Sequence, residues 1–82
     1  MRGIDKDSRY YKEFSRFTSK LAEKIYALRL ERGLTQEDMQ AFELSLRQYQ
    51  RIEQGQTVNM TLSNIYKICK AFDVKPHELL DI

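Results

Sequence analysis

The sequence predicts an all-α domain, and three observations support that fold class. Apolar side chains recur at helical spacing over much of the chain, first between Leu21 and Leu28 and again from Leu62 to Phe72. Side chains suited to cap a helix precede short amphipathic runs in the middle of the chain. The 82 residues include only three glycines and one proline and show no repeat or low-complexity tract, which favours a single domain with one small core.

Charge is distributed unevenly along the chain. With 14 basic and 12 acidic side chains the formal net charge is only +2, so the total charge does not point to a nucleic-acid partner. Residues 1–20, however, carry six basic side chains and three acidic ones. In residues 44–60, Arg47 and Arg51 are opposed by a single acid, Glu53. The excess positive charges of these two segments could together form one region of positive electrostatic potential.

Cys69 is the only cysteine, so the chain cannot form an intramolecular disulfide, and a reducing cytoplasm is the natural compartment. It shares a helical stripe with Ile65 and Ile68, and we expect a buried small hydrophobe rather than a redox thiol. No apolar run approaches the roughly 20 residues of a membrane span, and the charged first residues lack the apolar core of a signal peptide. We therefore expect a soluble, cytoplasmic protein.

Residues 1–19 are predicted to form an N-terminal arm and a helical extension ahead of the main domain at 20–82. The first residues are polar, and Asp7 or Ser8 can cap the helix that follows. The helical period then continues through Tyr10, Tyr11, Phe14, Phe17, Leu21, Ile25 and Leu28. This pattern fits either one long helix or two helices, and we favour a break near Thr18, whose side chain could cap a new helix.

The stretch from Leu34 to Gly55 predicts two short helices joined by a tight corner. Thr35 is a suitable N-cap for the first, and the acids that follow it suit the positive end of a helix. Ser45 offers a second N-cap, so the second helix should begin at Leu46 and stop at Gly55.

In the second of these helices, Tyr49 and Ile52 are three residues apart, so both side chains should face the core. The opposite face carries Leu46, Arg47, Gln50, Arg51 and Gln54. Arginine binds guanine edges or phosphate through paired hydrogen bonds, and glutamine pairs with the edge of adenine, so this face fits the major groove of DNA. The alternative is an ordinary surface helix whose solvated face happens to be basic and rich in amides.

Residues 56–60 are predicted to form a loop, and Thr61 is predicted to cap a helix over 62–72. The apolar stripe of that helix consists of Leu62, Ile65, Ile68, Cys69 and Phe72. The loop and the helix start could hold a phosphate, with hydrogen bonds from the side chains of Thr57, Asn59 and Thr61. Ordinary capping and turn chemistry explains the same residues equally well.

Pro76 is predicted to stand at the first position of a last short helix. That helix ends in the apolar side chains Leu79, Leu80 and Ile82. Their surface could close the core or meet a second subunit.

No stretch has the pattern of an enzyme or of a metal site. One histidine, one cysteine and scattered carboxylates show neither metal-ligand spacing nor a nucleophile beside a base, and there is no glycine-rich phosphate loop. His77 is expected to be a surface residue. We therefore expect no catalytic residue, no metal and no cofactor.

Several motifs together resemble those of a known family. The sequence GLTQEDM at 33–39 is followed by Leu44 and Ser45, by IEQG at 52–55 and by Thr61 with Leu62. Over about residues 21–80 this pattern resembles the helix-turn-helix domain of the phage repressor and Cro type. The resemblance implies a compact five-helix bundle of the lambda-repressor-like type, here with an added N-terminal helix or arm. It also implies that the second motif helix lies in the major groove of double-stranded DNA.

The resemblance implies roles for individual residues. Gln36 matches the position that contacts backbone phosphate and braces the recognition helix. The positions that meet base edges or nearby phosphates are matched by Ser45, Leu46, Arg47 and Arg51, with Gln48 and Gln50 on their flanks. Glu53 matches a buried acid that pairs with an arginine of the first helix, which here would be Arg29. Two such charges buried together must pair, because either one alone would be strongly destabilising.

Two features depart from the family pattern. Between Met39 and Ile52 the chain is one residue shorter than usual, and Glu43 stands where a glycine normally turns the corner. A residue other than glycine at a positive φ costs on the order of 1 kcal/mol. Either Glu43 tolerates this conformation or the shortened loop takes another route.

The function that the resemblance implies is that of a sequence-specific transcription regulator. It would bind a pseudo-palindromic operator as a homodimer and would block or contact RNA polymerase. The small size and the segment 59–62 also resemble the controller proteins of restriction-modification systems. The alternative is a protein-interaction module, such as an antitoxin-like partner, built on the same fold. The extension at 1–19 could be a dimer contact, a basic arm on DNA or a cover for exposed core.

Overall fold

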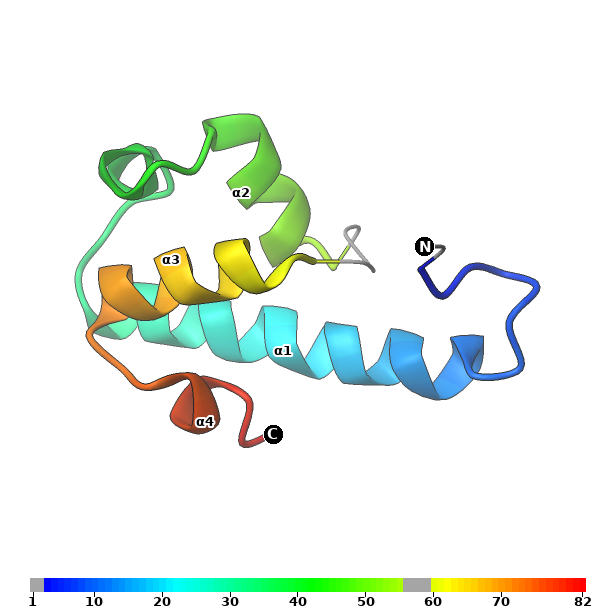
Figure 1. Cartoon of the computed structure of the whole chain (residues 1–82). Helices are drawn as coiled ribbons and strands as arrows, with labels where there is room; N and C mark the ends of the chain where they lie inside the picture. Colours follow the sequence, from blue (N-terminus) through cyan, green and yellow to red (C-terminus); the bar gives the residue numbers. More distant parts are fainter. Residues whose placement is uncertain (1–2, 56–59) are drawn as a thin grey trace.

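The computed structural model describes residues 3–55 and 60–82 of the chain. Within these two ranges the secondary structure consists of helices without any strand, which confirms the predicted all-α class. A 21-residue α-helix comes first, followed by a short 3-10 helix and three further α-helices. In chain order they are α1 (Tyr11–Glu31), η1 (Glu37–Phe42), α2 (Leu46–Glu53), α3 (Leu62–Phe72) and α4 (Pro76–Leu79) (Figure 1).

The five helices pack as a closed ring. α1 packs against α2, α2 against η1, η1 against α3 and α3 against α4, and α4 returns to α1. In Figure 1, α2 and α4 lie on opposite sides of the bundle, and the N-terminal half of α1 extends beyond the other helices. The predicted five-helix bundle is therefore present, with α1 as its longest element.

Every helix contributes to one apolar core. Its buried side chains are Leu21, Ile25, Met39, Leu44, Tyr49, Ile52, Ile65, Ile68, Cys69, Phe72 and Leu79. Cys69 is buried as predicted, and burial raises the pKa of its thiol, so the thiol stays protonated. None of the helices in the described part of the chain is long and apolar enough to span a bilayer.

The predicted break near Thr18 is wrong, because α1 runs without interruption from Tyr11 to Glu31. The Thr18 hydroxyl donates a 3.0 Å hydrogen bond to the carbonyl oxygen of Ser15. It thus bonds within its own helix instead of capping a new one, which is the other option open to a threonine inside a helix. The N-cap of α1 is Tyr10 rather than Asp7 or Ser8, although the Ser8 hydroxyl accepts a 3.2 Å bond from the Tyr10 N–H.

The first ten residues of α1 contribute nothing to the buried core. All of the buried residues of α1 lie from Leu21 onward. Phe14 and Phe17 stack on each other with their ring centroids 6.4 Å apart, and Phe17 remains 41% exposed. Tyr10 is also exposed. Phe14 and Phe17 therefore pack with each other, and none of the aromatic side chains of the extension belongs to the buried core.

Leu62 is the one predicted core residue of α3 that the structure places on the surface. It is 84% exposed, whereas the other four members of the predicted stripe are buried. Leu62 is the first residue of α3, and no described element covers this side of the first turn. Thr61 caps the helix as predicted, since its hydroxyl oxygen accepts a 3.2 Å bond from the N–H of Asn64.

The short helix α4 closes the ring against α1. Pro76 occupies its first turn as predicted, and Leu79 is fully buried. The Lys24 ammonium of α1 donates to the carbonyl oxygens of Glu78 and Asp81. Leu79 therefore closes the core, while Leu80 and Ile82 stay exposed.

Candidate nucleic-acid interface

The corner between η1 and α2 turns at Glu43, which adopts the left-handed conformation with φ 64° and ψ 30°. The sequence left two alternatives open, and the structure shows the first of them. Glu43 itself adopts the left-handed conformation that glycine usually takes at this corner. The next residue, Leu44, is buried in the core, and its burial helps to offset a backbone strain of about 1 kcal/mol.

The missing residue between Met39 and Ile52 is accommodated by the type of helix that precedes the corner. The six residues of η1 form a 3-10 helix rather than an α-helix. A 3-10 helix rises about 2.0 Å per residue against about 1.5 Å in an α-helix, so six residues span the length of about eight. The tighter helix thus reaches the corner with fewer residues.

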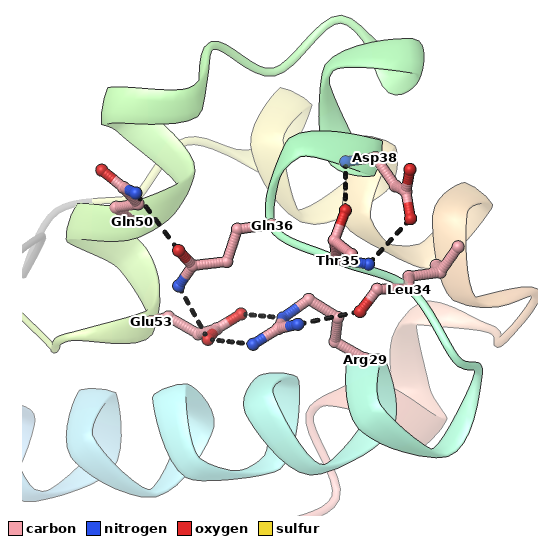
Figure 2. A network of polar contacts seen from close by, with 7 residues as sticks. All are labelled: Arg29, Leu34, Thr35, Gln36, Asp38, Gln50 and Glu53. Atoms are coloured by element: carbon pink, nitrogen blue, oxygen red, sulfur yellow. Dashed lines mark hydrogen bonds and ion pairs between the residues drawn. The ribbon is translucent and has the colours of Figure 1, made fainter.

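Thr35 and Asp38 fix the start of η1 by a reciprocal contact. The Thr35 hydroxyl oxygen accepts a 3.1 Å bond from the Asp38 N–H, and the Asp38 carboxylate accepts a 2.8 Å bond from the Thr35 N–H (Figure 2). Hydrogen bonding of the carboxylate to Thr35, chiefly to its backbone N–H, lowers the pKa of Asp38. The helix begins at Glu37, after Gln36, although Thr35 supplies the capping oxygen that the sequence predicted.

Ser45 begins the second helix as predicted. Its hydroxyl oxygen accepts a 3.1 Å bond from the N–H of Gln48, which caps α2. Because this bond uses the oxygen only as an acceptor, the hydroxyl proton stays available to a phosphate oxygen.

The exposed face of α2 is narrower than the sequence indicated. Tyr49 and Ile52 are buried as expected. Arg47, Gln48, Arg51 and Gln54 are exposed, whereas Leu46 and Gln50 are only half-exposed. Within the described residues, no hydrogen bond or ion pair engages the side chains of Arg47, Gln48 or Arg51. We refer to these three side chains as the α2 outer face.

Gln50 is not free to act with the α2 outer face. Its side-chain amide donates a 3.2 Å bond to the Gln36 side-chain oxygen, and the Gln36 amide donates a 3.3 Å bond to Glu53 (Figure 2). The two glutamines thus link η1 to α2. The expectation that Gln50 points outward is wrong to this extent.

The structure brings Arg29 of α1 and Glu53 of α2 together as a buried ion pair. The guanidinium donates from Nε to Glu53 Oε2 at 2.7 Å and from Nη2 to Oε1 at 3.0 Å (Figure 2). The third donor, Nη1, bonds the carbonyl oxygen of Leu34 at 2.8 Å. The two side chains are 9% and 4% exposed, so the pair is nearly enclosed. One arginine therefore joins α1, the segment before η1 and the end of α2.

Electrostatics at this pair favours both charged forms. The pKa of Arg29 is raised, mainly because its side chain bonds the Glu53 carboxylate. Burial on its own would raise the pKa of Glu53, but the hydrogen bonds led by Arg29 outweigh burial and lower it overall. The Tyr49 hydroxyl is buried beside the pair without hydrogen-bond geometry to a described residue, and burial raises its pKa.

Two predicted phosphate contacts, Thr57 and Asn59, lie outside the described residues. Thr61 is described, and its hydroxyl oxygen caps α3, which leaves its proton available to a phosphate in the same way as that of Ser45. His77 is exposed as expected.

One contact at the corner was not predicted from the sequence. The Lys67 ammonium of α3 donates a 3.1 Å bond to the carbonyl oxygen of Glu43. This bond connects the left-handed corner to α3. Its two residues are 24 positions apart in the sequence, so no local sequence pattern could predict the contact. The α2 outer face is therefore positioned by contacts to α1, η1 and α3.

A family described as helix-turn-helix matches residues 25–79, from the second half of α1 to the end of α4. A search of curated proteins gave no match, and neither did a search of solved structures.

Proposed function

Because the chain belongs to the helix-turn-helix family, a family of DNA-binding regulatory domains, we propose that it is a transcription regulator that binds a specific operator as a dimer. The observation that carries this proposal is the α2 outer face. Two arginines and a glutamine stand exposed on one helix, and no described residue pairs with their side chains, while the opposite face of that helix packs into the bundle.

The chemistry of the α2 outer face suits base edges in a major groove. Arg47 and Arg51 each carry a planar fork of donors that matches the acceptors of guanine or the oxygens of phosphate. Gln48 offers both a donor and an acceptor, as the edge of adenine requires. The Glu53 carboxylate is turned inward to Arg29 and is 4% exposed, so it does not oppose DNA phosphate.

The bundle holds this face rigidly. The chain of bonds from Arg29 through Glu53 and Gln36 to Gln50 fixes α2 against α1 and η1 (Figure 2). Side chains that are positioned before binding lose less entropy when they meet their target. In this proposal Gln36 and Gln50 therefore act mainly as braces for the side chains that read bases.

The remaining predicted contacts serve the DNA backbone and, for Leu46, a base edge in this proposal. The Ser45 hydroxyl lies at the start of α2, where it can donate to a phosphate. Leu46 is half-exposed in the first turn and can contact a thymine methyl group. Thr57 and Asn59 keep their proposed phosphate contacts as predictions.

A single α2 covers few base pairs, so useful specificity requires two copies on two half-sites about one helical turn apart. A dimer on such an operator would block or contact RNA polymerase. The narrower assignment, to the phage repressor type or to restriction-modification controllers, is part of the proposal and rests on the sequence motifs.

The experiment that tests this function is selection from a randomised DNA duplex pool, with affinity then followed against salt. We expect an enriched inverted repeat, and log affinity that falls steeply with log salt because phosphate contacts release counterions. Lys75→Ala is a matched control, since it removes one exposed positive charge beside α4, on the side of the bundle opposite α2 (Figure 1). Weak binding without any enriched sequence would contradict the proposal and favour a protein-interaction module.

A further inference from the structure

One face of α3 carries an apolar surface that the fold leaves uncovered. Leu62 and Tyr66 are 84% and 55% exposed, the highest values among the large apolar side chains of the described residues. They are four positions apart on one helix and therefore lie on the same face. A groove of about 590 Å³ lies beside them, and the edges of Ile65 and Pro76 complete its apolar walls. We call these four side chains the α3 patch.

The shape of the α3 patch suits a helix of another protein. A groove accepts the side chains that an amphipathic helix presents on its apolar face at intervals of three and four residues. A helix that binds a lipid surface instead inserts a broad face of large apolar side chains. α3 exposes only Leu62 and Tyr66 in this way, because most of its other apolar residues lie in the core.

The charges that α3 carries beside the α3 patch are positive. The helix contains Lys67 and Lys70 and no acid, and Asp73 comes only after its end. Within the part of the chain that the structure describes, neither lysine forms an ion pair with a carboxylate. Glu43 is the one acid among the residues that line the groove.

Both lysines are held in place before any partner binds. The Lys70 ammonium lies 5.3 Å from the centroid of the Tyr66 ring, in a cation–π contact. The Lys67 ammonium donates a 3.1 Å bond to the carbonyl oxygen of Glu43, and two of its three N–H donors remain for another acceptor. Groups that are ordered in advance lose less entropy on binding. The groove is thus bordered by ammonium groups that a carboxylate would complement.

We propose that the α3 patch docks an amphipathic helix of a different protein, one whose apolar face is flanked by aspartate or glutamate. Its apolar side chains fill the groove against Leu62 and Tyr66, and its carboxylates pair with Lys67 and Lys70. A DNA backbone would offer the negative charge but no apolar side chains for the groove.

The two kinds of contact contribute differently to this complex. Burial of large side chains at the centre of an interface supplies most of the binding energy, and charges at its rim select the partner and speed association. With two large anchors, we expect a dissociation constant in the micromolar range. None of the four side chains belongs to the α2 outer face, so the inference does not depend on DNA binding.

Selection from a randomised library of displayed peptides tests this inference. The bait is the full 82-residue chain, and peptides of about 15 residues are long enough to become helical on binding. We expect the enriched peptides to share apolar residues three and four positions apart and to contain more Asp and Glu than Lys and Arg. Enriched peptides without this spacing, enriched peptides that are basic, or no enrichment at all would overturn the inference.

The affinity of one enriched peptide for matched variants locates the binding surface. Leu62→Gln should bind at least about tenfold more weakly, because the burial of one large apolar side chain is lost. Its control is Leu30→Gln, since Leu30 is a leucine 53% exposed near the end of α1 and does not line the groove. Lys70→Glu should also weaken binding about tenfold at low salt, whereas Lys12→Glu, at an exposed lysine near the start of α1, should not.

Tyr66→Gln is a second apolar variant, so that a folding defect in one protein cannot decide the result. Circular dichroism should show each variant to be as helical as the wild type. If folded Leu62→Gln and Tyr66→Gln both bind the peptide as tightly as the wild type, the α3 patch is not the docking surface and the inference is overturned.

Two other occupants of the α3 patch would give different results. If the wild type sediments as a dimer and Leu62→Gln as a monomer, a second copy covers the patch and the inference is overturned. If the wild type but not Leu62→Gln co-sediments with phosphatidylglycerol vesicles, the patch meets a lipid surface and the inference is overturned as well. None of these measurements contains DNA, so failure to select an operator refutes the proposed function alone.

Discussion

Replacing Arg29 by methionine should destabilise the protein strongly. The guanidinium and the Glu53 carboxylate are 9% and 4% exposed and share two hydrogen bonds of 2.7 and 3.0 Å. Methionine retains apolar bulk but leaves the carboxylate and the Leu34 carbonyl without this donor. Breaking a buried pair from one side costs about 3–5 kcal/mol. We expect the lower end of that range, because Gln36 still donates to Glu53.

A loss of about 3 kcal/mol is a large part of the stability of such a domain, which for 82 residues is about 4–12 kcal/mol in total. In domains of this size 1 kcal/mol moves the thermal midpoint by about 4–8 °C, so the expected drop is about 12–24 °C. Thermal unfolding followed by circular dichroism measures this shift directly. Urea unfolding at constant temperature gives the free-energy difference independently.

The matched control is Glu31→Gln, which removes an exposed ion pair with Arg32. In that pair Arg32 Nη1 lies 3.2 Å from Glu31 Oε1, and the side chains of Arg32 and Glu31 are 33% and 69% exposed. Its loss should therefore cost less than about 1 kcal/mol. The double variant Arg29→Met with Glu53→Leu should recover much of the loss, because neither charge is then buried alone. An Arg29→Met protein with a midpoint within about 3 °C of the control would refute the reasoning that this pair holds α1 against α2.

Three other residues give predictions of their own. Glu43→Gly should raise the free energy of unfolding in urea by about 0.5–1 kcal/mol, because φ 64° strains a side chain but not glycine, and Glu43→Val should lower it. The pKa of Glu53 is lowered by folding, so its ionised form stabilises the fold above the unfolded pKa, and this contribution disappears as pH falls through the folded value. Between about pH 6 and about pH 3, stability should therefore fall more steeply in the wild type than in Glu53→Gln, and equal slopes would contradict this. Arg51→Ala should reduce the slope of log affinity against log salt by about 1, and an unchanged slope would exclude a phosphate contact.

Features that depend on neighbouring residues could be predicted from the sequence. Ser45 and Thr61 each cap a helix by accepting a bond from an N–H three residues ahead, and Pro76 stands at the start of α4. Each of these features is specified within one helical turn. The all-α class followed in the same way from the spacing of apolar residues.

Features that depend on distant partners could not be predicted. Lys67 bonds the carbonyl of Glu43 across 24 positions, and Arg32 donates a 2.8 Å bond to the carbonyl of Phe72 across 40. The sequence does not indicate which backbone oxygen either of these long side chains will bond. The pairing of Arg29 with Glu53 was expected only because the motifs resemble those of a family.

The errors have a common physical origin, since one sequence pattern permits two structures. Thr18 can cap a new helix or bond back into a continuing one, and the structure takes the second course. Leu62 has the spacing of a core residue, but spacing does not tell whether another element covers the first turn of α3. The helical period predicts that Gln50 points outward, but its long side chain donates a hydrogen bond to Gln36.

The central claim is that the α2 outer face reads DNA bases, and the most direct test repeats the duplex selection with Arg47→Ala. The variant should bind the wild-type operator about 1–3 kcal/mol more weakly and should lose its preference at one base step in each half-site. All other selected positions should be unchanged, and Lys75→Ala should select the wild-type sequence. If Arg47→Ala selected the same sequence with the same affinity, Arg47 would not touch the bases and the account of this face would be contradicted.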